Sequence, residues 1–83
     1  MLRGIQMSEV SIEQRVSYWK NKIGIGSVWL LQSFNTRKAT VERVYFDLNC
    51  GSVVVDYTLE DCPPAIQTAE VEYFLNYIVQ CRA

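Results

Sequence analysis

A hairpin signal in the middle of the chain is the feature that most constrains its fold. The segment Asn49-Cys50-Gly51-Ser52 separates two stretches, residues 39–48 and 53–59, in which apolar and polar residues alternate. Asn and Gly tolerate the positive φ of tight turns, and alternation with a period of two is typical of half-buried strands. The pattern therefore predicts two antiparallel strands joined by a turn centred on Cys50-Gly51.

This turn also predicts which side chains share a face of the sheet, because side chains alternate along a strand. Three apolar pairs lie on one face: Leu48 with Val53, Phe46 with Val55, and Val44 with Tyr57. The other face is mostly polar and carries Arg43, Asp47, Asp56, Thr58 and Glu60, together with Val41, Tyr45 and Val54. An antiparallel pair with one apolar face is expected to bury that face in the core.

A further strand is predicted at residues 28–34, before a turn centred on Thr36-Arg37. In this register Trp29 lies opposite Val44, so Trp29 and Leu31 join the apolar face. The same register places an apolar patch with a basic rim on the polar face: Val28, Leu30 and Tyr45, surrounded by Arg37, Lys38 and Arg43. Two interpretations stay open, because either a flanking helix covers this patch or a partner binds it. A loop of different length would exchange the faces of this strand.

The segment before the strands has the signature of an amphipathic helix over residues 11–23. Ser11 followed by Gln14 fits a capping box, and Gly24 suits the left-handed conformation that ends many helices. Four apolar residues recur at helical spacing between these ends: Ile12, Val16, Trp19 and Ile23. We expect residues 1–7, which precede this pattern, to be disordered.

Two structures are compatible with the C-terminal part of the chain. Pro63 and Pro64 end the preceding strand, because proline cannot donate to a ladder. One alternative is an amphipathic helix over residues 68–81, indicated by the apolar stripe Val71, Phe74, Leu75 and Ile78. The other is a short strand at residues 66–70, one helical turn at 71–76 and a last strand at 77–81.

These predictions combine into a single α+β domain. We expect a small, strongly bent antiparallel sheet of three to five strands. The domain consists of an N-terminal helix (11–23), a meander (27–59) and a C-terminal helix or helical turn with a strand (65–82). The chain has no apolar run that would span a bilayer and no signal-peptide core. We therefore expect a cytoplasmic protein with no membrane partner, in which Cys50, Cys62 and Cys81 are unpaired thiols.

Several short motifs lie in the same order as in a known group of proteins. They are Gly26-Ser27-Val28-Trp29, Ala39-Thr40-Val41, the run VVVDY at residues 53–57, and Phe74-Leu75. This order resembles small phage- and prophage-encoded proteins, in which a G-x-V-W segment opens a bent sheet and an F-L turn closes a Src-homology-3-like barrel. The resemblance spans about residues 26–78. It implies a compact binding module but identifies no ligand, because a fold does not determine a function.

The composition argues against most catalytic chemistry. The chain has no histidine, which removes the commonest general base and the base of Ser–His and Cys–His pairs. Its cysteines lack C-x-x-C spacing, and no glycine-rich phosphate loop is present. Asp56, Glu60 and Asp61 lie close together in sequence, but exposed acids of this kind are usually solvated. We predict neither enzymatic activity nor a metal or cofactor.

Charge is divided unevenly along the chain. Residues 1–43 have a balance of +4 and residues 44–83 a balance of −5, which gives the net charge of −1. The favoured hypothesis is a small phage or mobile-element factor that binds a host protein and inhibits or adapts it, including counter-defence roles such as anti-CRISPR inhibition. The alternative is a nucleic-acid-binding module that uses the basic residues of the first hairpin. Homo-oligomerisation stays open.

Overall fold

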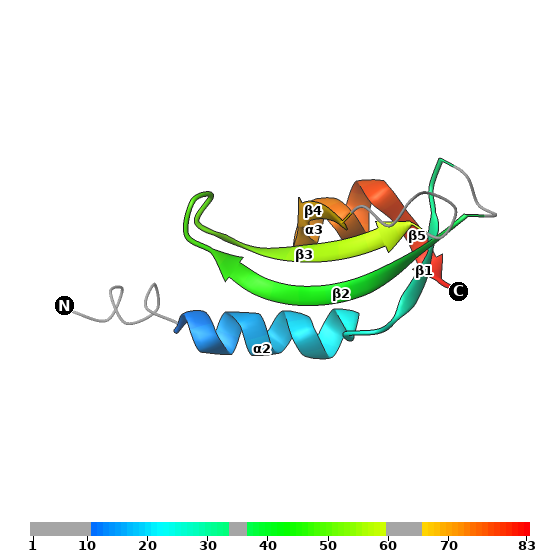
Figure 1. Cartoon of the computed structure of the whole chain (residues 1–83). Helices are drawn as coiled ribbons and strands as arrows, with labels where there is room; N and C mark the ends of the chain where they lie inside the picture. Colours follow the sequence, from blue (N-terminus) through cyan, green and yellow to red (C-terminus); the bar gives the residue numbers. More distant parts are fainter. Residues whose placement is uncertain (1–10, 34–36, 60–65) are drawn as a thin grey trace.

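The structure is a computed structural model that describes residues 11–33, 37–59 and 66–83. Figure 1 shows its elements in chain order: α2 (Ile12–Ile23), β1 (Val28–Leu31), β2 (Lys38–Asp47), β3 (Ser52–Leu59), β4 (Ile66–Glu70), α3 (Val71–Tyr73), the π-helical turn η1 (Phe74–Ile78) and β5 (Val79–Arg82). The predicted α+β class is therefore confirmed. Disorder at residues 1–7, the acids at positions 60 and 61 and the thiol at position 62 lie outside the described residues.

Five antiparallel strands form one bent sheet in the order β4-β3-β2-β1-β5. Figure 1 shows β2 and β3 as long curved neighbours, with β1 and β5 at the end of the sheet far from the β2–β3 turn. The second C-terminal alternative is confirmed, because β4, α3–η1 and β5 are a strand, a helical turn and a strand. Within the described residues β4 and β5 are the two edges of the sheet.

The N-terminal helix begins and ends as the sequence predicts. The Ser11 hydroxyl accepts a hydrogen bond of 3.0 Å from the Gln14 backbone N–H, which satisfies an otherwise unpaired donor of the first turn. At the other end Gly24 has a φ of 83° and donates its N–H to the Lys20 carbonyl. A side chain at Gly24 would be strained in this left-handed conformation. Figure 1 shows that α2 runs along β2.

The core lies on one face of the sheet, and all three described helical segments pack on that face. Phe74 is fully buried, and its ring centroid lies 5.1 Å from that of Tyr57 on β3 and 6.0 Å from that of Trp29 on β1. The helical turn therefore contacts both β3 and β1, on the two sides of the central strand β2, through one aromatic cluster. Trp19 packs against this core, as predicted. Among the described residues, no helix has both the length and the apolar character needed to span a membrane.

The register of the predicted hairpin differs from the expected one by two residues. Phe46 pairs with Val53, and Val44 pairs with Val55. The turn is thus four residues long, and Leu48, predicted to face the core, lies in it with an exposed fraction of 83%. Because the shift is even, the side chains of Phe46 and Val55 stay on the predicted apolar face. The residue pairs are wrong, but the assignment of these residues to faces is confirmed.

A β-bulge at Glu42 corrects the prediction for the first half of β2. The register shifts between Val41 and Arg43, so Val41 pairs with Tyr57 and is buried in the core rather than on the polar face. An extra residue in one strand reverses the facing of every residue before it and bends the strand. The Glu42 carboxylate itself accepts a hydrogen bond of 3.0 Å from the Thr58 hydroxyl across the ladder.

The register of β1 also differs from the prediction. Trp29 pairs with Ala39 instead of Val44, because the connection between the strands is centred earlier than Thr36-Arg37. The bulge compensates for part of this change, since the first half of β2 now points its odd-numbered residues into the core. Trp29 and Leu31 consequently lie on the core face as predicted.

Candidate functional site

The structure separates the residues that were predicted to form one binding patch. We call the sheet face opposite the core the outer face. Leu30 lies on this face opposite Lys38, and Val28 lies opposite Thr40 instead of Tyr45. Both apolar side chains are half-buried, and the described helices pack on the other face of the sheet. A covering helix, one of the two predicted explanations for this patch, is therefore wrong within the described residues.

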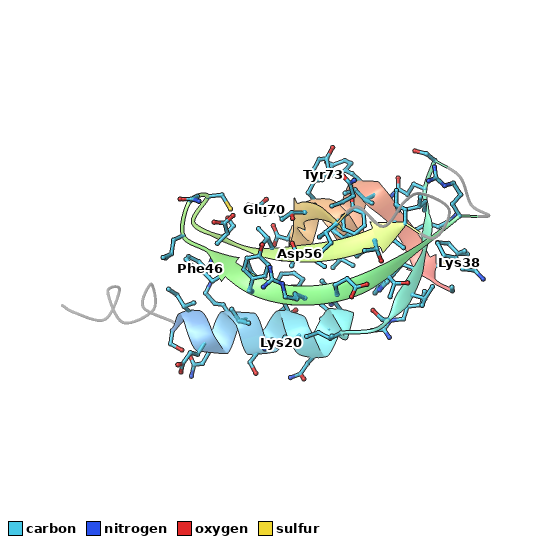
Figure 2. The ribbon with its side chains drawn as sticks, viewed as in Figure 1. Lys20, Lys38, Phe46, Asp56, Glu70 and Tyr73 are labelled. Atoms are coloured by element: carbon cyan, nitrogen blue, oxygen red, sulfur yellow. The ribbon has the colours of Figure 1, made fainter. Side chains whose placement is uncertain are left out.

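Arg43 and Tyr45 lie farther along β2, beyond the bulge, where they pair with Asp56 and Val54. Figure 2 shows Lys38 and Phe46, the residue after Tyr45, toward opposite ends of β2. The sequence-predicted site is therefore two separate groups of residues on one face. Its apolar centre, formed by Val28 with Tyr45, does not exist because the β1 register differs.

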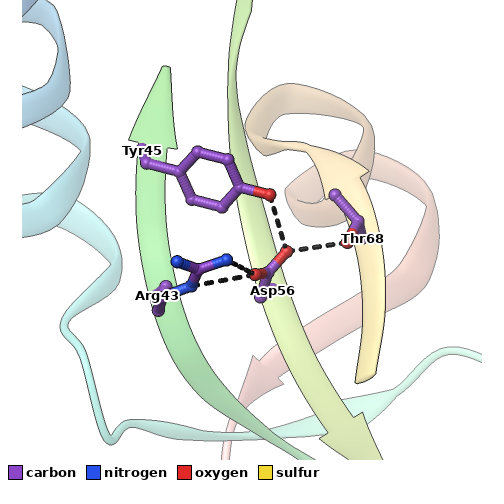
Figure 3. A network of polar contacts seen from close by, with 4 residues as sticks. All are labelled: Arg43, Tyr45, Asp56 and Thr68. Atoms are coloured by element: carbon purple, nitrogen blue, oxygen red, sulfur yellow. Dashed lines mark hydrogen bonds and ion pairs between the residues drawn. The ribbon is translucent and has the colours of Figure 1, made fainter. Parts of the chain in front are cut away.

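The second group forms a polar network around Asp56, which has an exposed fraction of only 3% (Figure 3). One Asp56 carboxylate oxygen accepts hydrogen bonds from Arg43 Nε (3.1 Å) and Nη2 (2.9 Å). The other oxygen accepts from the hydroxyls of Tyr45 (3.2 Å) and Thr68 (2.7 Å). A buried carboxylate is tolerated when its lone pairs are satisfied in this way. The network joins β2, β3 and β4 on the outer face.

Protonation states support this network. The hydrogen bond to Asp56 and the charge of Asp56 raise the pKa of Arg43, so the guanidinium stays charged. Burial, followed by the Asp56 carboxylate, raises the pKa of Tyr45, so the phenol keeps the proton that it donates. Asp56 is therefore buried and hydrogen-bonded rather than a solvated acid as expected, and its oxygens are already occupied. Within the described residues, no group of side chains has the composition of a metal site.

The basic residues of the first hairpin do not form the single patch that the nucleic-acid hypothesis requires. Arg43 bonds to Asp56, and Arg82 donates to the Lys22 and Ile23 carbonyls at the end of α2. Lys38 lies at the Leu30 end of the outer face, away from Arg43. Phosphate binding needs several unengaged cations on one surface. The predicted cluster of Arg37, Lys38 and Arg43 is therefore divided by the fold.

A groove of about 240 Å³ lies where β1, β3, β4 and η1 meet. We call it the aromatic groove; its lining residues are Leu31, Ser33, Arg37, Tyr57, Leu59, Gln67, Tyr77 and Ile78. Leu31 and Tyr57 are buried, whereas the Tyr77 side chain has an exposed fraction of 66%. Apolar and aromatic walls with a few polar groups are typical of sites that bind a ligand or a peptide.

Two tyrosines give this region an unusually exposed aromatic surface. The rings of Tyr73 and Tyr77 lie on the same helical turn with their centroids 5.1 Å apart, and Tyr73 has an exposed fraction of 54%. Burial, and to a smaller extent Tyr73, raises the pKa of Tyr57, so its phenol stays protonated. Tyr57 lines the groove, so its phenol adds a polar group to the wall.

A second, smaller recess of about 110 Å³ lies at the other end of β4. It is lined by Arg15, Trp19, Ser52, Val53, Glu70, Val71 and Glu72. Glu70 and Glu72 are exposed, and within the described part of the chain neither has an ion-pair partner. We call it the acidic recess. Figure 2 shows Glu70 and Tyr73 on the same side of the molecule, beside β4 and α3.

Sequence reasoning missed the aromatic groove because it assigned Tyr57 to the core and left Tyr77 without a role. Its signal was the pair Tyr73 and Tyr77, which lie off the apolar stripe of the C-terminal segment and are therefore exposed. Comparisons of the chain with protein-family models, curated proteins and solved structures found no significant match. The geometry of the groove and of the sheet edges is thus the basis for a functional proposal.

Proposed function

We propose that this chain is a non-enzymatic protein-binding module and that the aromatic groove is its binding surface. The observation that carries the proposal is the combination of a buried apolar floor, Leu31 and Tyr57, with the exposed wall residue Tyr77. Tyrosine is enriched among the residues that dominate binding energies, because it buries much area at low entropic cost and also offers a hydroxyl. The groove lies beside β4, which adds an open sheet edge to the same surface.

The remainder of the proposal concerns the biological setting. The order of short motifs that resembles phage-encoded Src-homology-3-like proteins supports a small factor that inhibits or adapts a host protein, including a counter-defence role. In this structure the G-x-V-W segment leads into β1, and Phe74-Leu75 lies in the turn before β5. Cys50 and Cys81 are exposed and unpaired, which favours a reducing compartment such as the cytoplasm. Nucleic-acid binding is less favoured because Arg43 and Arg82 are engaged within the protein.

Site-specific photo-crosslinking tests the binding surface. A photoreactive phenylalanine analogue is placed at Tyr77 and, as a matched control, at Tyr18, which is similarly exposed on α2. Both proteins are irradiated in an extract of cells that naturally express the chain. We expect a discrete protein adduct from position 77 only. Adducts with nucleic acid, or the same adducts from both positions, would contradict the proposal.

The affinity of the identified partner then gives a quantitative check. Tyr77→Ala should weaken binding by about tenfold or more, because the groove loses its exposed wall. Tyr18→Ala should leave the affinity unchanged. Both substitutions should change the free energy of unfolding by only about 0.5 kcal/mol or less, as expected for surface positions. Equal affinities for wild type and Tyr77→Ala would place the binding surface elsewhere.

A further inference from the structure

β4 is an edge strand, so the backbone groups on its free side are open to pairing with another chain. β4 pairs with β3 along its whole length, from Thr58 opposite Ile66 to Val54 opposite Glu70. Within the described residues, no backbone group outside this ladder bonds to β4. An edge strand of this kind presents unpaired N–H and C=O groups that another extended chain can bond.

β4 has no lysine, proline or bulge, and its one charged residue, Glu70, is its last residue. Proteins blunt exposed edges with lysine, proline, bulges or very short strands. The sequence of β4 is IQTAE, and its register with β3 is continuous. The first three residues of β4 are exposed: Ile66, Gln67 and Thr68. β5, the other edge, is shorter, carries Arg82 and pairs with β1 through a register shift.

Two recesses flank the ends of the β4 edge. Gln67 lines the aromatic groove, and Glu70 lines the acidic recess. These residues are three positions apart on β4, which is about 10 Å at the rise of a β-strand. An extended segment bonded to β4 therefore reaches both recesses at once.

We propose that β4 binds an extended segment of a partner protein as a sixth strand, with an apolar or aromatic side chain in the aromatic groove and a lysine or arginine at Glu70 and Glu72. This inference rests on the proposed function, since it specifies how the same surface recognises its partner. Backbone hydrogen bonds supply affinity in such strand addition, and the side-chain recesses supply specificity.

Charge complementarity identifies the basic residue of the partner. Glu70 and Glu72 are exposed carboxylates without an ion-pair partner in the described part of the chain. Arg15 lines the same recess, but its guanidinium lies over the Phe46 ring, 5.7 Å from the centroid, so the two carboxylates outnumber the one cation and can accept from a second. Trp19 lines the same recess and provides an aromatic side chain for the stem or charge of that cation.

Gln67 pairs with Tyr57 on the core face, whereas Glu70 pairs with Val54 on the opposite face. Because side chains alternate along a strand, the apolar and basic residues of the partner are an odd number of positions apart, about three.

Selection from a display library of random linear peptides tests this inference on the full chain. We expect the selected peptides to share an apolar or aromatic residue and a basic residue at that spacing. Their affinity should fall about tenfold in the double variant Glu70→Gln/Glu72→Gln, and more steeply with salt for wild type than for this variant. Glu13→Gln on α2 is the matched control and should bind like wild type.

Amide hydrogen exchange measured by NMR separates strand addition from simple groove binding. On binding a selected peptide, alternate amides of β4 should exchange at least about tenfold more slowly, while β5 amides keep their exchange rates. Peptides that require Tyr77 but leave β4 exchange unchanged would overturn strand addition and leave the proposed function standing. If no selected peptide requires Tyr77, both proposals fail. Concentration-dependent protection of β4 without peptide, together with a doubled mass, would show that a second copy of the chain occupies the edge and would also overturn the inference.

Discussion

The two edge strands of the sheet are held in place in different ways. β5 is fixed by contacts with several other elements, since Arg82 bonds to the end of α2 and lies 5.0 Å over the Trp29 ring. Gln32 adds side-chain bonds to the carbonyls of Asn76 in η1 and Val79 at the start of β5. β4 is joined to its neighbours on the outer face through Thr68 and the buried Asp56. β5 is therefore held by side chains from several elements, whereas β4 is held by its ladder with β3 and by the Asp56 network.

This difference suggests a division of roles between the two ends of the sheet. Side-chain contacts that cover a strand stabilise it and also exclude other chains from its edge. The Arg82 and Gln32 contacts stabilise β5 by joining it to α2 and to the end of β1. The Asp56 network lies on the outer face, so it positions β4 while its backbone edge stays open. An edge used for recognition needs this combination of fixed position and unpaired backbone groups.

The largest effect is expected where both edges depend on the same residue. Phe74 is fully buried against Tyr57 and Trp29, so Phe74→Ala should cost about 3–5 kcal/mol of unfolding free energy, measured by urea denaturation. Leu48→Ala, at an exposed turn position, is the control and should change stability by about 0.5 kcal/mol or less. A small loss for Phe74→Ala would show that the helical turn does not connect the two edges.

A smaller and more local effect is expected at the β4 edge. Asp56→Ala removes the acceptor shared by Arg43, Tyr45 and Thr68, and should cost about 1–3 kcal/mol. Hydrogen exchange should accelerate in β4 beyond the global change, while β5 follows the global change only. Thr68→Val, which keeps the shape of Thr68 but removes its hydroxyl, should reproduce the acceleration in β4. Uniform acceleration in both strands would contradict the proposed local role of this network.

The sequence predicts the fold class well because the signals for it are local. The Ser11 cap, the Gly24 end and the hairpin signal near Cys50 each act within a few residues, and all three are confirmed as structural features. The pairing registers are less predictable because turn length and bulges decide them. The bulge left a trace in the sequence, since buried residues on β2 change from odd positions, Ala39 and Val41, to even positions.

The candidate site is less predictable than the fold, since it depends on those registers. Val28 and Tyr45 were expected to be neighbours only because β1 was placed five residues too far along β2. The aromatic groove depends on where β4 and η1 pack, which involves pairings distant in sequence. The Asp56 network was likewise inaccessible, because it needs the β2, β3 and β4 registers together. The alternation of apolar and polar residues indicated which face of the sheet a residue occupies, but it did not indicate which residues of the adjacent strands lie beside it.

The smallest effect is expected at the β5 edge, and it tests whether the contacts there act separately from those at β4. Arg82 donates to the Lys22 and Ile23 carbonyls at 3.1 and 2.7 Å, where a cation also interacts favourably with the negative end of the α2 dipole. Arg82→Gln should therefore cost about 1 kcal/mol, because the exposed Lys22 carbonyl regains water and the Ile23 carbonyl keeps the Ser27 hydroxyl as a donor when the guanidinium is lost. Urea denaturation gives the stability change, and hydrogen exchange should accelerate at the end of α2 and in β5 but not in β4. Acceleration of β4 amides by Arg82→Gln would show that the two edges are coupled, which would remove the physical basis for treating them as separate.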